Sequence, residues 1–98
     1  MLALDRDALA DLCREFSVRS LAVFGSAVTD RFDPERSDVD FLVDFADDAP
    51  RTLEHYFRLK EALEGLVGRS VDLVEASALR NPFVIASIET SKEELYAA

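Results

Sequence analysis

The sequence predicts a small α/β (α+β) domain, in which a mixed sheet of three or four strands is covered by helices mainly on one face. Short apolar segments with alternating polar positions, typical of strands, occur at 20–24, 38–45 and 70–74. Segments with apolar residues three and four positions apart, typical of helices, lie before, between and after them. The resulting order, helix, strand, strand, helix, strand, helix, fits a single domain over residues 1–98.

The first helix is expected near the N-terminus, where Asp5 or Asp7 can cap it. Its apolar face has the spacing i, i+3, i+4, i+7 and consists of Leu9, Leu12, Cys13 and Phe16. Because a buried free cysteine behaves as a small hydrophobic residue, Cys13 is predicted to belong to the core and not to act as a nucleophile. A strand from Ser20 to Phe24 follows and ends at Gly25-Ser26.

A second helix is expected after the turn at 47–50, with Pro50 near its first turn. Gly65 and Gly68 mark its end. Its buried stripe is predicted to consist of Leu53, Tyr56, Phe57, Leu59, Leu63, Leu66 and Val67.

The last third of the chain begins with a short strand from Ser70 to Val74. Asn81-Pro82 is typical of an N-cap followed by the first residue of a helix. The tail is compatible with two structures, since Ser91 and Glu94 resemble a capping box while Leu95-Tyr96 could equally form an extended segment.

Charge and composition exclude several classes of protein. The formal net charge of −9 argues against direct binding of nucleic acid through the general surface, because phosphate backbones attract Lys and Arg. No apolar run approaches the roughly 20 residues that span a bilayer, so no membrane association is expected. The only cysteine cannot form an internal disulfide, and the N-terminus does not resemble a signal peptide. A cytoplasmic protein is expected.

Three aspartates on the predicted strands are candidate metal ligands. Asp38 and Asp40 alternate with Val39 and Phe41, so both carboxylates lie on one face of their strand. Asp72 would join them if the strand at 70–74 lies beside the strand at 38–45. Such a trio can hold two divalent cations roughly 3.5–4 Å apart and serve phosphoryl chemistry. Mg²⁺ is the expected ion, because carboxylate ligands suit it.

The Gly25-Ser26 pair at the end of a strand adds a candidate phosphate site. Glycine has no Cβ to block a phosphate, and serine offers a hydroxyl donor beside its own N–H group. The same alternation of aspartates is also compatible with a plain solvent-exposed face of a sheet. The chain has neither dinucleotide-binding nor Walker glycine motifs, and the lone His55 does not suggest a catalytic triad.

At these residues the sequence resembles the minimal nucleotidyltransferases of the polymerase-β-like superfamily. The resemblance rests on Phe24-Gly25-Ser26, on Ser37-Asp38-Val39-Asp40 and on Val71-Asp72-Leu73-Val74. The sequence is similar in particular to the antitoxin half of HEPN/MNT toxin–antitoxin pairs. This resemblance implies the polymerase-β-like fold. That resemblance also implies Mg²⁺-dependent transfer of AMP from ATP to a tyrosine of a HEPN ribonuclease toxin, in a hetero-oligomer with that toxin.

The resemblance implies a role for each motif residue. Gly25 and Ser26 would bind the phosphates of ATP, while Asp38 and Asp40 would bind two metal ions. Asp72 would contribute to the metal site and activate the acceptor hydroxyl.

Two alternatives remain open at this level. The acidic chain could be a catalytically silent binding module that neutralises a basic partner by direct contact, which its net charge would support. It could also modify a small molecule such as an aminoglycoside, although so short a chain has little left to build an acceptor pocket.

Overall fold

The computed structural model describes residues 4–25 and 39–98, which form three α-helices and one four-stranded sheet. The sheet has the strand order β3-β2-β1-β4; β2 and β3 are parallel, and the other neighbours are antiparallel. The predicted mixed sheet is thereby confirmed. In chain order the elements are α1 (Arg6–Glu15), β1 (Val18–Phe24), β2 (Val39–Phe45), α2 (Leu53–Val67), β3 (Val71–Glu75), the 3₁₀ turn η2 (Ala76–Ala78), α3 (Pro82–Ser91) and β4 (Glu93–Ala97).

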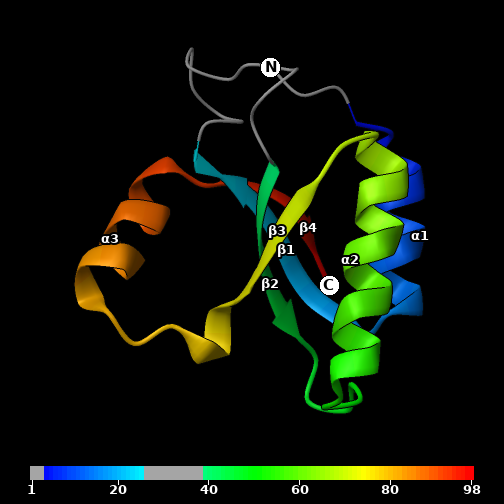
Figure 1. The fold of residues 1–98 in the computed structure, drawn as a ribbon, viewed down its shortest axis with the longest axis horizontal. Helices are drawn as coiled ribbons and strands as arrows, with labels where there is room; N and C mark the ends of the chain where they lie inside the picture. Colours follow the sequence, from blue (N-terminus) through cyan, green and yellow to red (C-terminus); the bar gives the residue numbers. More distant parts are fainter. Residues whose placement is uncertain (1–3, 26–38) are drawn as a thin grey trace.

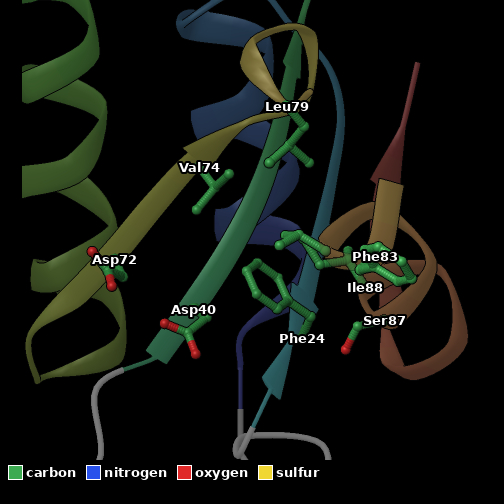
Figure 2. Close-up of a pocket in the computed structure, with 9 residues that line it drawn as sticks. Phe24, Asp40, Asp72, Val74, Leu79, Phe83, Ser87 and Ile88 are labelled. Atoms are coloured by element: carbon green, nitrogen blue, oxygen red, sulfur yellow. The ribbon is translucent and has the colours of Figure 1, made fainter. Parts of the chain in front are cut away.

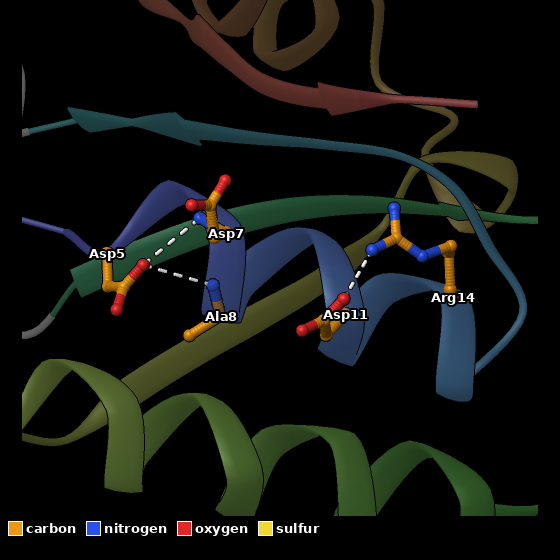
Figure 3. A network of polar contacts seen from close by, with 5 residues as sticks. All are labelled: Asp5, Asp7, Ala8, Asp11 and Arg14. Atoms are coloured by element: carbon orange, nitrogen blue, oxygen red, sulfur yellow. Dashed lines mark hydrogen bonds and ion pairs between the residues drawn. The ribbon is translucent and has the colours of Figure 1, made fainter.

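Helix α1 begins at one of the two aspartates that the sequence offers as caps. Asp5 is the N-cap, and its Oδ1 accepts hydrogen bonds from the backbone N–H groups of Asp7 and Ala8, each at 3.1 Å (Figure 3). Two of the helix's unpaired amide donors are satisfied in this way. Arg14, in the last turn, pairs with the carboxylate of Asp11, so opposite charges lie on adjacent turns of the exposed side.

Helix α2 begins and ends differently from the sequence expectation. Thr52 caps it by accepting a hydrogen bond from the His55 N–H group at 3.1 Å, so Pro50 lies before the helix and not in its first turn. Gly65 lies inside the helix, and Gly68 alone ends it, with a φ of 75° in the left-handed region. Packing of the stripe on α2 against the sheet outweighs the low helix propensity of Gly65.

The main core lies between the sheet and the helix pair α1 and α2, which Figure 1 shows together on one side of the strands. The predicted inward face of β2 is confirmed, because all four of its residues are buried: Val39, Phe41, Val43 and Phe45. Helix α1 contributes Leu9 and Cys13, both fully buried, as the sequence predicts for Cys13. The contribution of α2 differs in part from the predicted buried stripe. Leu53 and Phe57 are 75% and 52% exposed and do not belong to that stripe.

Helix α3 lies against the opposite face of the sheet (Figure 1). Its one buried residue, Ile88, packs with Ala22 of β1 and Leu42 of β2 in a second, smaller cluster. Asn81 caps the helix by accepting from the N–H groups of Phe83 and Val84, and Pro82 occupies the first position as predicted. The sheet is therefore covered fully on one face and partly on the other.

The tail is extended, which resolves the choice left open by the sequence. Glu93–Ala97 forms β4 and pairs antiparallel with β1 along its outer edge. Leu95 and Tyr96 are half-buried against the main core, and this packing favours a strand over one more turn of helix. Over the described part of the chain, no helix is long and apolar enough to cross a membrane.

Candidate active site

Asp40 and Asp72 lie side by side on the face of the sheet that α3 only partly covers. They are register partners in the parallel pair of β2 and β3, and Figure 2 shows both carboxylates near the start of these strands. The adjacency that the sequence made a condition of its metal site is therefore present for this pair. Asp40 is half-buried and Asp72 is exposed, so ligands can reach both from solvent.

Gly25 lies directly against Asp40. It follows the last residue of β1, and Phe24 is the register partner of Asp40 across the antiparallel pair. Gly25 has a φ of +72°, and a Cβ added there would be 2.6 Å from Oδ2 of Asp40. Both the backbone conformation and this close approach require glycine. Gly25, at the end of β1, and the Asp40 carboxylate, near the start of β2, are therefore in direct proximity.

Two of the predicted site residues, Ser26 and Asp38, lie outside the described residues. Among residues 4–25 and 39–98, no group of three or more His, Cys, Asp or Glu side chains is arranged to hold a metal ion. The structure therefore brings together Gly25, Asp40 and Asp72 from the predicted set.

Side chains of α2 hold the free edge of β3, the strand that carries Asp72. The Val71 N–H group donates to Oε2 of Glu64 at 3.1 Å, and the Tyr56 hydroxyl donates to the Leu73 carbonyl. Because β2 occupies the other edge of β3, these contacts satisfy backbone groups that no neighbouring strand would reach. They fix the strand on which Asp72 depends for its position.

Electrostatics at this edge follow from the same contacts. The hydrogen bond from Val71, together with the bond from Lys60 at 3.1 Å, lowers the pKa of the Glu64 carboxyl. Burial, followed by the negative charge of Asp72, raises the pKa of the Tyr56 phenol. Tyr56 is therefore a neutral hydrogen-bond donor at physiological pH and braces β3 in that form.

His55 and Cys13 have structural surroundings. Nε2 of His55 lies 2.7 Å from the Phe16 carbonyl oxygen, and its ring packs at 5.4 Å against both Phe16 and Phe45. Burial raises the pKa of the Cys13 thiol to about 11, so the thiolate is scarce at neutral pH. The burial of Cys13 confirms its predicted place in the core. His55 is a half-buried residue of α2.

A cavity of about 470 Å³ opens beside the two aspartates, between the sheet and α3. Sequence reasoning did not find it, although one signal was present. Phe83, Val84 and Ile85 are three consecutive apolar residues at the start of a helix, and all three are exposed. Three residues in a row span about 200° of the helix circumference, which is more than a single packed face usually buries. The lining consists of Phe24, Asp40, Asp72, Val74, Leu79, Phe83, Val84, Ser87 and Ile88 (Figure 2).

Residues 6–95 match the model of the nucleotidyltransferase domain. The chain belongs to this family. It is 45% identical over 71 residues to protein adenylyltransferase MntA of Thermococcus cleftensis. The matched region covers 72% of this chain and 69% of that protein. This chain is 40% identical over 78 residues to a Methanocaldococcus jannaschii protein assigned as a protein adenylyltransferase, covering 80% and 76% of the two chains. The recognition of a nucleotidyltransferase from its motifs is confirmed, and the chain is a nucleotidyltransferase.

Solved structures confirm the polymerase-β-like fold. A protein assigned as a minimal nucleotidyltransferase has a TM-score of 0.71 at 37% identity, covering 90% of this chain and 86% of its own. A toxin–antitoxin structure with AMP-PNP has a TM-score of 0.71 at 20% identity, covering 97% and 75%. A complex of the tri-AMPylated Shewanella oneidensis HEPN toxin with MNT antitoxin has a TM-score of 0.64 at 20% identity, covering 95% and 70%.

Proposed function

We propose that this nucleotidyltransferase is the antitoxin of a HEPN/MNT pair, which transfers AMP from ATP to a tyrosine of its HEPN toxin in a Mg²⁺-dependent reaction. The observation that carries the proposal is the register pairing of Asp40 with Asp72 directly beside Gly25. Relatives named as protein adenylyltransferases support the reaction class. Fold neighbours crystallised with a HEPN toxin and with AMP-PNP support the partner and the nucleotide.

The donor set fits Mg²⁺. Asp40 and Asp72 offer only carboxylate oxygens, the ligands that this ion prefers, and both carboxylates are accessible from the cavity. Asp38, which precedes β2 in the sequence and lies outside the described residues, is the third proposed ligand. Two Mg²⁺ ions held by these residues would neutralise charge on the phosphates.

In the proposed reaction the acceptor phenol oxygen forms a bond to the α-phosphorus of ATP. The bond from that phosphorus to the bridging oxygen of the leaving pyrophosphate breaks, and pyrophosphate leaves with the electron pair. Asp72 accepts the phenolic proton, which its exposed position beside the cavity allows. Gly25 and Ser26 hold the triphosphate through their backbone N–H groups, next to the Asp40 carboxylate that lies against Gly25. Positioning accounts for most of the catalysis.

The proposal is tested by replacing Asp40 with Asn, which keeps the shape of the side chain and removes its charge. We expect transfer of label from α-labelled ATP to the HEPN toxin to fall on the order of 10²–10³-fold or more, because charge stabilisation at the phosphates is lost. Asp44→Asn is the matched control: Asp44 lies on the same strand, four residues on, and pairs with Arg19 away from the site. Transfer at the wild-type rate by Asp40→Asn would refute the proposal.

The net charge of −9 favours one second candidate, a silent acidic module that neutralises the toxin by contact alone. The same variant separates the two. If Asp40→Asn silences the ribonuclease activity of the toxin without ATP as well as the wild-type chain does with ATP, contact is sufficient and transfer is not the mechanism of neutralisation.

A further inference from the structure

We infer that the cavity beside Asp72 is an aryl pocket, which receives the ring of the acceptor tyrosine and selects a phenol over an aliphatic hydroxyl. This inference rests on the proposed function, because it names the part of the same site that recognises the acceptor. The observation that carries it is the distribution of polar and apolar side chains along the cavity lining.

The polar side chains of the cavity lie toward one end of it (Figure 2). Asp40 and Asp72 occupy the end where β2 and β3 begin, and Ser87 lies at the same level on α3 (Figure 2). The rest of the lining is apolar and consists of Phe24, Val74, Leu79, Phe83, Val84 and Ile88. A ligand that fits this division has an apolar body and one polar tip directed at the aspartates.

A tyrosine side chain has this construction, since its hydroxyl is the only polar group on an aromatic ring. With the ring between α3 and the sheet, the hydroxyl would be placed at Asp72, the proposed proton acceptor. A nucleobase fits less well, because each base carries several donors and acceptors on its edges. Leaving them without partners among apolar side chains costs free energy. The cavity volume of about 470 Å³ lies within the range typical of ligand pockets, about 300–1,000 Å³.

The aromatic side chains of the wall are suited to this ligand. Phe83 is a large apolar residue of the lining and is 84% exposed, and Phe24 is half-buried opposite Asp40. Aromatic pairs gain free energy beyond simple burial of area when their rings meet edge to face or offset. The exposure of Phe83 is explained if an acceptor ring covers it during the reaction.

The first test is binding of N-acetyl-tyrosinamide, followed through methyl resonances of the isotopically labelled chain. We expect shifts confined to Val74, Leu79, Val84 and Ile88, with no comparable shifts from adenosine. Phe83→Ala should weaken binding by about tenfold or more, and its high exposure means that the fold tolerates the truncation. Val84→Ala should cause a smaller loss. Leu53→Ala is the matched control, since Leu53 is a similarly exposed apolar residue on α2 and lines a different cavity.

The second test is steady-state transfer to the HEPN toxin. We expect Phe83→Ala to lower kcat/KM for the toxin by about tenfold and to leave KM for ATP within about twofold of wild type. A raised KM for ATP with unchanged acceptor kinetics, or adenosine shifts in place of tyrosinamide shifts, would overturn the inference and make the cavity a nucleobase site. Wild-type chain that binds N-acetyl-tyrosinamide but transfers nothing would instead refute the proposed function and leave the pocket standing.

Discussion

The two faces of the sheet differ in how completely helices cover them. On one face, α1 and α2 seal a continuous core in which Phe41, Leu59 and Leu63 are fully buried. On the other, α3 buries a single residue, Ile88, and leaves a cavity in front of the aspartate pair. Both faces belong to the same strands. Along β2, residues such as Phe41 therefore pack in the core, while the alternate residue Asp40 lines the cavity.

The difference shows where stability and chemistry are located in this fold. The sealed face removes apolar side chains from water and supplies most of the driving force for folding. The open face keeps carboxylates accessible and presents apolar side chains to solvent, which would be unfavourable without a ligand to cover them. The free energy of folding that the sealed face supplies allows the other face to stay only partly covered by helix.

Truncating the sealed core should have the largest effect on stability. Phe41→Ala is expected to lower the free energy of unfolding by about 3–5 kcal/mol, because it leaves a cavity that the surrounding residues cannot fill. Ile88→Ala is the counterpart on the open face. It should cost nearer about 2 kcal/mol, the low end for such a substitution, since its small cluster borders the solvent-accessible cavity. Urea denaturation measures both, and a larger loss for Ile88→Ala would reverse the assignment of the faces.

A substitution at the junction of the two faces should have an intermediate effect. Gly25→Ala is expected to cost about 1–2 kcal/mol because of its left-handed backbone. It should also lower AMP transfer at least about tenfold, since the new methyl group displaces the Asp40 carboxylate.

Gly65→Ala is the matched control for that substitution. A Cβ at Gly65, inside α2, meets nothing within 4 Å, so alanine there should stabilise the chain by about 0.5–1 kcal/mol and leave transfer unchanged. Thermal unfolding and label transfer distinguish the two glycines. Equal effects at both positions would show that Gly25 has no special role.

The smallest effect is expected at the edge of β3 and depends on pH. The pKa of Glu64 is lower in the folded chain than its ordinary value, because the Val71 N–H group and Lys60 favour its charged form. Its contribution to stability is therefore complete above the pKa of the unfolded chain, near 4.5, and is lost as pH falls through the lower folded pKa.

Melting temperatures of wild type and Glu64→Gln between about pH 7 and pH 3 measure this contribution. The variant should melt lower at neutral pH, and the gap should close in acid. Glu61→Gln, on the same helix and exposed to solvent, serves as the control. A gap that widens in acid would contradict the sign of the effect.

Much of the site could be recognised in the sequence because it depends on local patterns. A glycine ending a strand, an Asp at an alternate position of the next strand and a third strand with a single Asp made Gly25, Asp40 and Asp72 candidates. The resemblance to the minimal nucleotidyltransferases then gave them roles. The structure confirms that these three residues lie close together. Their roles stay predictions, as do those of Ser26 and Asp38, which lie outside the described residues. The cavity was missed because its walls come from β1, β3 and α3, and no local spacing shows which elements face one another.

The sequence alone determined the alternation of β2 and the burial of Cys13, and it limited the cap of α1 to Asp5 or Asp7. Each of these follows from dihedral geometry or from hydrophobicity within a few residues. The tertiary structure decided the rest. Pairing with β1 made the tail a strand, packing carried α2 through Gly65, and the position of α3 left the aspartate face open. These outcomes depend on contacts between segments far apart in the chain, whose free energies no single segment contains.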